Sequence, residues 1–159
     1  MGNEVVIYTD GAASGNPGPG GYGVVMLYKG YEKTISEGFK RTTNNRMELL
    51  AVIVALESMK TPNLPIRIYS DSKYVVDAIE QGWLKNWEKK SFKKTKNPDL
   101  WIRFLKIYRN FPDIKFNWVK GHANDVLNNR ADQLAVEASK ANNLKTDVGY
   151  ENPENTLFN

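Results

Sequence analysis

Four acidic residues stand at the end of, or inside, runs of apolar residues: Asp10, Glu48, Asp71 and Asp132. Moving an unpaired carboxylate out of water costs several kcal/mol, so an acid in such a place usually has a cation or several hydrogen-bond donors as its partner. Carboxylates that meet at one place also repel one another unless a cation lies between them. The four acids therefore indicate a metal site, provided that the fold brings them together.

The available ligands favour a hard divalent ion. The chain has no cysteine and a single histidine, so a carboxylate site offers oxygen ligands, which suit Mg²⁺ better than zinc. Two such ions about 3.5–4 Å apart activate a water molecule and stabilise the leaving oxygen of a phosphodiester. The histidine, His122, lies in the polar loop 121–127, where it suits proton transfer better than structural ligation. An exposed histidine without a role is the alternative.

Each acid also has an ordinary local explanation. Asp10 and the glycine after it form a dipeptide that is typical of turns. Asn45 and Glu48 have the spacing of a capping box, and Asp71 is a suitable N-cap for a following helix. An acid at the boundary of a buried helix face accounts for Asp132. These explanations stay open for each residue singly.

The elements that must position the acids follow from the hydrophobic patterns. Strands are expected at 5–9, 22–28, 31–39, 66–70 and 114–119. Helices are expected at 47–59, from 71 to about 82, within the lysine-rich segment, from 98 to about 109, and at 128–142. Short connections make the first three strands an antiparallel meander, and a helix makes the fourth strand parallel to the first by a right-handed crossover.

The expected fold class is therefore α/β, with a mixed five-stranded sheet (three antiparallel strands, two parallel) and helices on both faces. Parallel strands place functional residues at their C-terminal ends, so Asp10 and Asp71 are expected to be neighbours. A length of 159 residues fits one domain. We place that domain at 1–144 and expect 145–159 to be a polar, irregular and flexible tail.

Positive charge is concentrated in one segment. The net charge is +4, and residues 84–96 contain six lysines and one glutamate, a net +5, which leaves −1 for the rest of the chain. Trp83, Trp87 and Phe92 are interleaved with these lysines. Basic residues with aromatic rings suit a phosphate backbone and stacked sugars or bases. A solvated lysine-rich helix face is the alternative.

The composition excludes several other classes. Without cysteine there is no disulfide framework and no thiolate zinc site. No stretch approaches 18 apolar residues, and the N-terminus lacks a basic-then-apolar signal region. We therefore expect a cytoplasmic protein without membrane attachment.

Several stretches resemble the bacterial type 1 ribonuclease H family, and the likeness extends from about Val5 to Tyr150. They are Thr9-Asp10-Gly11, Gly15-Asn16-Pro17-Gly18, the run from Thr42 to Leu49, Asp71-Ser72, the run from Trp118 to His122, and Asn128 with Ala131-Asp132. The resemblance implies a ribonuclease H-like fold. It also implies a monomeric endonuclease that hydrolyses the RNA strand of RNA–DNA hybrids, largely independently of sequence, leaving 5′-phosphate and 3′-hydroxyl ends.

The resemblance also implies a role for each site residue. Asp10, Glu48, Asp71 and Asp132 would hold two Mg²⁺ ions, or Mn²⁺ as a substitute, with Asp10 bridging, and His122 would assist proton transfer or product departure. Contacts to the hybrid's backbone and ribose would come from Gly11, Asn16, Thr43, Asn44, Asn45 and Lys73. Contacts along the DNA strand would come from a basic protrusion at about 83–97, through Trp83, Asn86, Trp87, Lys89 and Lys90.

Three positions depart from the family's pattern. Lys73 stands where a glutamine is frequent, which would turn a neutral ribose contact into a charged phosphate contact. Asn129 replaces a common glutamate, and Asn124 stands where a glycine is frequent. None of the three removes a principal metal ligand, so the departures bear on rate and ion optimum.

Rival interpretations fit less well. A non-catalytic hybrid-binding module would be expected to have lost an acid, and all four are present. Integrases and junction resolvases of the same superfold lack the asparagine cluster combined with the lysine–tryptophan segment. An ATP-binding member of the superfold would need a second domain, which this length does not accommodate.

Overall fold

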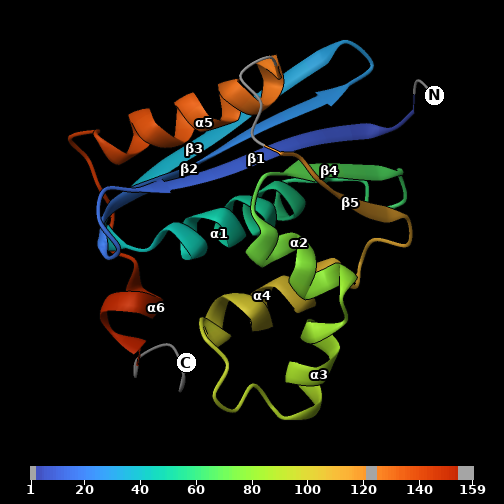
Figure 1. Cartoon of the computed structure of the whole chain (residues 1–159). Helices are drawn as coiled ribbons and strands as arrows, with labels where there is room; N and C mark the ends of the chain where they lie inside the picture. Colours follow the sequence, from blue (N-terminus) through green and yellow to red (C-terminus); the bar gives the residue numbers. More distant parts are fainter. Residues whose placement is uncertain (1–2, 121–124, 154–159) are drawn as a thin grey trace.

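A five-stranded sheet forms the centre of the structure, a computed structural model that describes residues 3–120 and 125–153 (Figure 1). The strands are β1 (Val5–Ala13), β2 (Gly18–Tyr28), β3 (Tyr31–Thr42), β4 (Ile66–Ser70) and β5 (Ile114–Trp118). Their order across the sheet is β3-β2-β1-β4-β5. The first three are antiparallel, β4 pairs with β1 in parallel, and β5 pairs with β4 in parallel. The predicted mixed sheet is confirmed.

The first three strands extend beyond their predicted ends. β1 continues through Asp10 to Ala13, where it pairs with Gly20 of β2, and β3 continues to Thr42. Backbone hydrogen bonds carry the ladder through the glycine-rich stretch, although glycine gives no side-chain signal for a strand. Asp10 therefore lies within a strand, and the interpretation of Asp10 and its glycine as a turn is wrong.

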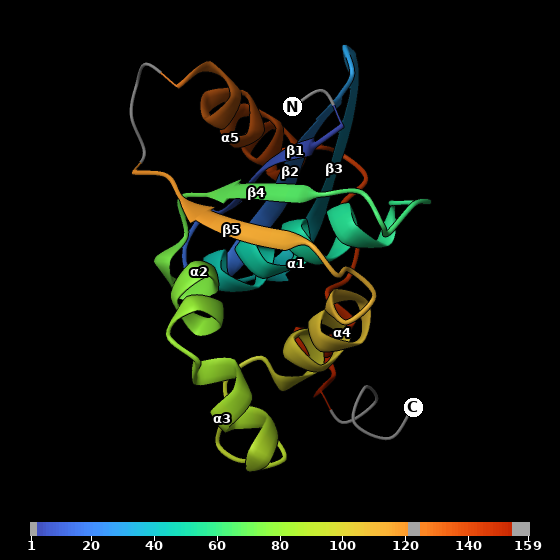
Figure 2. The ribbon, with the colours of Figure 1, turned by 90° about the vertical axis from the view of Figure 1, so that its right-hand side faces the viewer.

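Helices cover both faces of the sheet. They are α1 (Asn44–Glu57), α2 (Lys73–Glu80), α3 (Trp83–Lys89), α4 (Pro98–Tyr108), α5 (Val126–Ser139) and α6 (Val148–Glu151). Figures 1 and 2 show α5 against β1, β2 and β3 on one face, and α1 on the other face with α2 and α4 beside it. Among the described residues, no helix combines the length and apolarity that crossing a bilayer requires.

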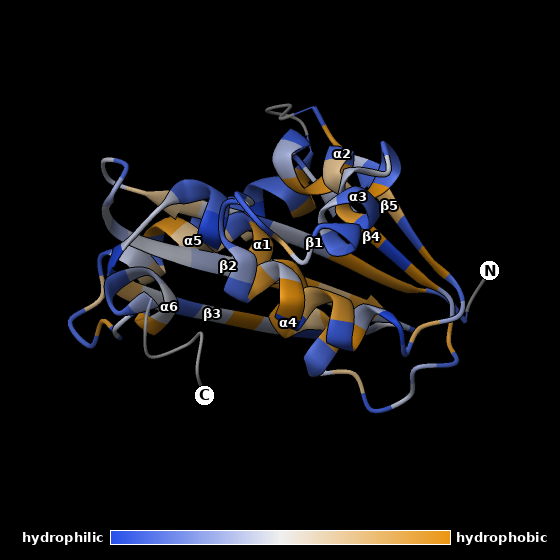
Figure 3. Cartoon of the chain, turned by 90° about the horizontal axis from the view of Figure 1, so that it is seen from below, coloured by the Kyte–Doolittle hydropathy of each residue, from blue (hydrophilic) through white to orange (hydrophobic). Residues whose placement is uncertain are grey.

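The core lies between the sheet and α1. Met47, Leu49, Ile53 and Leu56 of α1 are completely buried, as are Ile7 of β1 and Ile68 of β4 in the strands beside it. Figure 3 shows the hydrophobic run along α1, which contrasts with the hydrophilic α3. Because α1 is apolar on nearly every side, it fits only between two layers, here the sheet and α4.

The starts of α1 and α2 rule out two of the local explanations for acids. Thr43 caps α1, since its hydroxyl accepts a hydrogen bond from the third helical N–H at 3.2 Å. The capping box proposed for Asn45 and Glu48 is therefore wrong. Ser72 caps α2 in the same way at 3.2 Å, so Asp71 is not the N-cap. The helix starts thus leave both carboxylates available for other partners.

The segment after α5 differs from the irregular tail that the sequence suggested. Lys145 forms a parallel bridge with Phe39 of β3, and α6 follows. Asp147, just before α6, is buried and bonded to α1 and β3. A polar sequence can be ordered in this way when its charge finds a buried partner. The division of the chain at residue 144 stays a prediction.

Candidate active site

The parallel pairing of β1 with β4 brings Asp10 and Asp71 together. Thr9 of β1 pairs with Ser70 of β4, so the residues that follow them lie side by side. Glu48 reaches the same place from the beginning of α1. One carboxylate oxygen from each of Asp10, Glu48 and Asp71 lies within 4.8 Å of the other two. The structure thus brings three of the four acids into one cluster, as convergence at the sheet end predicted.

The cluster is buried and poor in donors. Asp10 and Glu48 are 3% and 4% exposed. Asp10 accepts one hydrogen bond, from the backbone N–H of Gly11 at 2.8 Å. Within the described part of the chain, Glu48 Oε2 and Asp71 Oδ1 are buried without a hydrogen-bond partner. Buried, unpaired carboxylate oxygens are the donor set that a hard divalent cation prefers, so these residues fit a metal ion.

Burial and mutual repulsion shift the cluster's acidity. Burial raises the pKa of Asp10 to about 8, and the nearby Asp71 carboxylate adds to the rise. Burial, followed by the charge of Asp10, raises the pKa of Glu48 well above its ordinary value. Burial also raises the pKa of Asp71. Without a cation the cluster therefore retains protons that isolated carboxyl groups would release at neutral pH.

Asp132 stands apart from the other three acids. It lies on α5, is exposed, and is not among the three carboxylates of the tight cluster. Its carboxyl group nevertheless contributes to the raised pKa values of Asp10 and Asp71. Because Asp132 is exposed while Asp10 and Glu48 are buried, it lies on the solvent side of the cluster.

A polar surface forms where the glycine-rich loop meets the start of α1. The side-chain oxygen of Asn16 accepts a hydrogen bond from the backbone N–H of Asn44 at 3.0 Å, which holds the loop against the helix. The hydroxyl of Thr43 is occupied as the helix cap. Asn16, Asn44 and Asn45 are exposed. Their amide groups can therefore donate to and accept from a ligand.

Trp118, to which the sequence analysis gave no separate role, links Asp71 and Lys73. The indole N–H of Trp118 donates to the backbone carbonyl of Asp71 at 3.1 Å. The ammonium of Lys73 lies over the Trp118 ring, 4.7 Å from its centroid, a cation–π distance. A tryptophan at the end of the strand beside Asp71 was the available signal, but nothing in the sequence says which way its ring points.

The basic segment projects from the body of the protein. Figures 1 and 2 show α3 farther from the sheet than α2 and α4. Asn86, Lys89 and Lys90 are exposed, and Trp83 is 47% exposed. Trp87 is only partly exposed, because its ring packs against Trp101 of α4 with centroids 5.5 Å apart. One of the two tryptophans is thus a free surface ring, whereas the other anchors α3.

The single acid of the basic segment is paired. Glu88 forms an ion pair with Arg109, which follows α4. The lysines of the segment are therefore not opposed by a free carboxylate within it. His122, the candidate for proton transfer, and Asn124 lie outside the described residues.

Comparisons with known proteins agree with this geometry. The family model "RNase H" matches residues 2–140. A ribonuclease H from Desulforamulus reducens is 58% identical over 150 residues, covering 91% of this chain and 93% of that protein.

Two solved structures are similar throughout. LC9-RNase H1, a type 1 RNase H, has a TM-score of 0.77 at 28% identity, covering 88% of this chain and 74% of that chain. LC11-RNase H1, solved in complex with an RNA/DNA hybrid, has a TM-score of 0.64 at 33% identity, covering 86% of this chain and 96% of that chain.

Proposed function

The chain belongs to the ribonuclease H family, and we propose that it cuts the RNA strand of RNA–DNA hybrids internally, leaving 5′-phosphate and 3′-hydroxyl ends. Ribonuclease H activity follows from the family membership together with the acid cluster. The observation that carries the proposal is the convergence of Asp10, Glu48 and Asp71 where the pairing of β1 with β4 ends. Hydrolysis of a phosphodiester with two metal ions needs such a cluster of carboxylate ligands.

The four acids would hold two Mg²⁺ ions, with Mn²⁺ as a substitute. When bound, the ions would activate a water molecule and stabilise the leaving oxygen. The protein's own part is to fix the carboxylates: β1 and β4 hold Asp10 and Asp71, and α1 holds Glu48. Asp132, on the solvent side, would complete the ligand set. His122 would move a proton to the leaving group or assist product departure.

Selectivity for the RNA strand would come from the surface around the start of α1. Ribose 2′-hydroxyls mark the strand to be cut, and short amide side chains can both donate to them and accept from them. Asn16, Asn44 and Asn45 are exposed and held close together by the Asn16–Asn44 hydrogen bond. Thr43 would add a backbone contact, as would Lys73 from the first turn of α2.

The DNA strand would lie along α3. Trp83 offers an exposed ring, and Asn86, Lys89 and Lys90 offer donors to phosphates. LC11-RNase H1, which covers 86% of this chain, binds an RNA/DNA hybrid, and this likeness supports the same substrate here. We also propose that the protein acts as a monomer in the cytoplasm, in keeping with its cysteine-free composition.

A cleavage assay tests the proposal. The purified protein is incubated with a labelled RNA–DNA hybrid, an RNA duplex and a DNA duplex, each with Mg²⁺ and with EDTA. We expect cutting of the hybrid's RNA strand only, its loss in EDTA, and products with 5′-phosphate ends. Asp10→Asn serves as the inactive control. Binding of the hybrid by the native protein without cutting would favour the alternative, a non-catalytic hybrid-binding module.

A further inference from the structure

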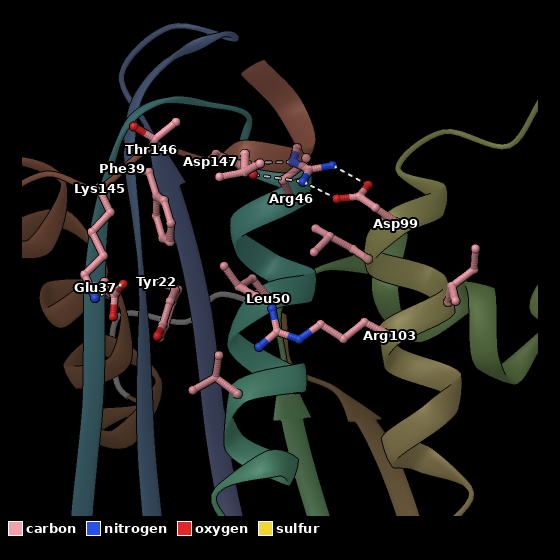
Figure 4. Close-up of a pocket in the computed structure, with 15 residues that line it drawn as sticks. Tyr22, Glu37, Phe39, Arg46, Leu50, Asp99, Arg103, Lys145, Thr146 and Asp147 are labelled. Atoms are coloured by element: carbon pink, nitrogen blue, oxygen red, sulfur yellow. Dashed lines mark hydrogen bonds and ion pairs between the residues drawn. The ribbon is translucent and has the colours of Figure 1, made fainter. Parts of the chain in front are cut away.

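The charged side chain of Arg46 is buried and uses every donor that it has. Arg46 is 2% exposed. Its guanidinium makes two hydrogen bonds to Asp147 (2.8 and 2.9 Å), two to Asp99 (2.9 and 2.7 Å) and one to the side-chain oxygen of Asn97 (3.3 Å). Figure 4 shows Arg46 between the two carboxylates. Burial would lower the pKa of Arg46, but the bonds to Asp99 and Asp147 outweigh it and raise the pKa.

These bonds join three separate parts of the chain. Arg46 is the third residue of α1, directly after Asn44 and Asn45. Asn97 and Asp99 lie where the basic segment ends and α4 begins, and Asp147 comes from the C-terminal segment. The network also reaches α2, because Asn97 donates to the hydroxyl of Tyr74 at 3.0 Å. One guanidinium thus connects the proposed ribose contacts with the base of the proposed DNA contacts.

The C-terminal segment, Lys145–Glu151, is held mainly by polar contacts. Lys145 makes two backbone hydrogen bonds with β3, to Gly38 and Lys40. Asp147 accepts from the Thr42 hydroxyl at 2.6 Å in addition to its bonds from Arg46. Beneath the segment lies a cavity of about 730 Å³, lined by side chains of β2, β3, α1 and α4 (Figure 4). Lys145 also forms an ion pair with Glu37 of β3 at 2.8 Å. Asp147 is the residue whose side-chain hydrogen bonds attach the segment to α1.

Gly149 shows how closely this segment approaches the ion network. A β-carbon at Gly149 would lie 1.9 Å from Asp99 Oδ2 and 2.7 Å from Arg46 Nη2. Real β-carbons do not come so close to other atoms, so any side chain here would push the network apart. The backbone at Gly149 thus lies directly against the Arg46 guanidinium and the Asp99 carboxylate, which are hydrogen-bonded to each other.

We propose that the docked C-terminal segment aligns the start of α1 with the base of the basic segment through Arg46, so that Asp147 and Gly149 are positioning residues for hybrid binding. The inference rests on the proposed function, since it assumes that α1 and the basic segment both contact the hybrid. Asp147 touches neither the acid cluster nor the substrate surface in this role. It acts by fixing Arg46, which then fixes Asn97 and the first turn of α1.

Asp147→Asn tests the proposal without removing a residue of the proposed active site. The variant keeps the side-chain shape but loses the ion pair, so we expect KM for the hybrid to rise about five- to tenfold with kcat little changed. The added positive charge would by itself favour a polyanion, so a rise in KM would not be a long-range charge effect. Asp113→Asn is the matched control, because it breaks a surface pair with Arg67 and changes the charge equally.

Gly149→Ala provides a second route without any change in charge, and it keeps the test decisive if Asp147→Asn does not fold. Both variants are assayed well below their melting temperatures. An increase in KM for the folded variants, absent from Asp113→Asn, supports the proposal. Lower melting temperatures with an unchanged KM would mean that the network is only structural and would overturn it. A native protein that fails to cut the hybrid would instead overturn the proposed function.

Discussion

Gly11 lies directly against the backbone of Glu48. A β-carbon at position 11 would be 2.3 Å from the Glu48 backbone nitrogen and 2.5 Å from the carbonyl carbon of Met47. No side chain fits in that space, so β1 and α1 approach this closely only because the residue is glycine. The contact sets the separation of Asp10 and Glu48, which lie on the two elements. Gly11 thus has a structural role in the cluster, whether or not it also touches the substrate.

Gly11→Ala should therefore damage catalysis strongly. The added methyl group forces α1 away from β1 and displaces Glu48, and a shift of about 1 Å in a reacting group can cost about a hundredfold in rate. We expect kcat/KM to fall by about that factor and the Mg²⁺ concentration for half-maximal rate to increase. Gly30→Ala is the control: position 30 has a positive φ of 82° but open space around it. It should cost stability and leave the rate unchanged.

The metal-free protein should become less stable as the pH rises. The pKa of Asp10 is about 8 in the folded protein, against an ordinary value of 3.8. The folded protein therefore keeps a proton that the unfolded chain releases. The stabilisation is complete below the unfolded pKa and is lost as the pH rises through about 8. Glu48 and Asp71, whose pKa values are also raised, act in the same direction.

Urea denaturation in EDTA at several pH values across this window measures the effect. Asp10→Asn should make the free energy of unfolding fall less steeply with pH. At the alkaline end it should raise that free energy by about 0.5–2 kcal/mol relative to the native protein. Mg²⁺ should restore part of the lost stability of the native protein, because it binds only the folded state. Stability that increases with pH in EDTA, with no difference between the two proteins, would contradict the assigned pKa shift.

Trp118→Phe should lower kcat more than it raises KM. The substitution keeps an aromatic ring for Lys73 but removes the N–H that donates to the Asp71 carbonyl. Groups that orient a metal ligand typically contribute about 10–100-fold to metal affinity or activity, and we expect the low end of that range, about tenfold. Trp83→Phe is the matched control on the basic segment. Trp83→Phe should change KM and leave kcat unaltered. If the two variants have equal effects on kcat and KM, Trp118 does not position Asp71.

Replacing Lys85, Lys89 and Lys90 together by alanine should raise KM and change kcat little. Their long-range attraction acts equally on the bound substrate and the transition state. The slope of the logarithm of the binding constant against the logarithm of the salt concentration should become shallower by about 0.7–0.9 for each phosphate contact removed. The control is a second triple variant with alanine at Lys29, Lys33 and Lys60, which are exposed outside the basic segment, so that the same charge is removed. If both triple variants behave alike, net charge alone explains the result and the segment is only a solvated face.

The sheet topology and the position of two acids could be predicted because both depend on short-range patterns. Apolar runs mark β1 and β4, and parallel pairing then makes Asp10 and Asp71 neighbours. The capping box considered for Asn45 and Glu48 was wrong because any of the four polar residues 42–45 can cap a helix. Moving the start by two residues changes the position of Glu48 in the helix. Only the observed hydrogen bond selects Thr43.

The C-terminal contacts could not be predicted from local pattern. Asp147 and Arg46 are 101 positions apart, and the residues around Asp147 are polar and show no regular hydrophobic pattern. Arg46 stands inside the stretch 42–49 that resembles the ribonuclease H family, but the sequence analysis gave it no role. A charged residue directly before a buried helical run nevertheless indicates that the charge needs a partner. The partner itself is a property of the tertiary structure.

The docked C-terminal segment also has a consequence for solubility. β3 is an edge strand of twelve residues, and such an edge offers unpaired backbone groups to other chains. Lys145 occupies part of that edge, because its backbone bonds to Gly38 and Lys40. A chain that ended at Leu144 would present these groups to a second copy. Part of the C-terminal sequence thus covers a sheet edge that would otherwise be open to pairing with a second copy.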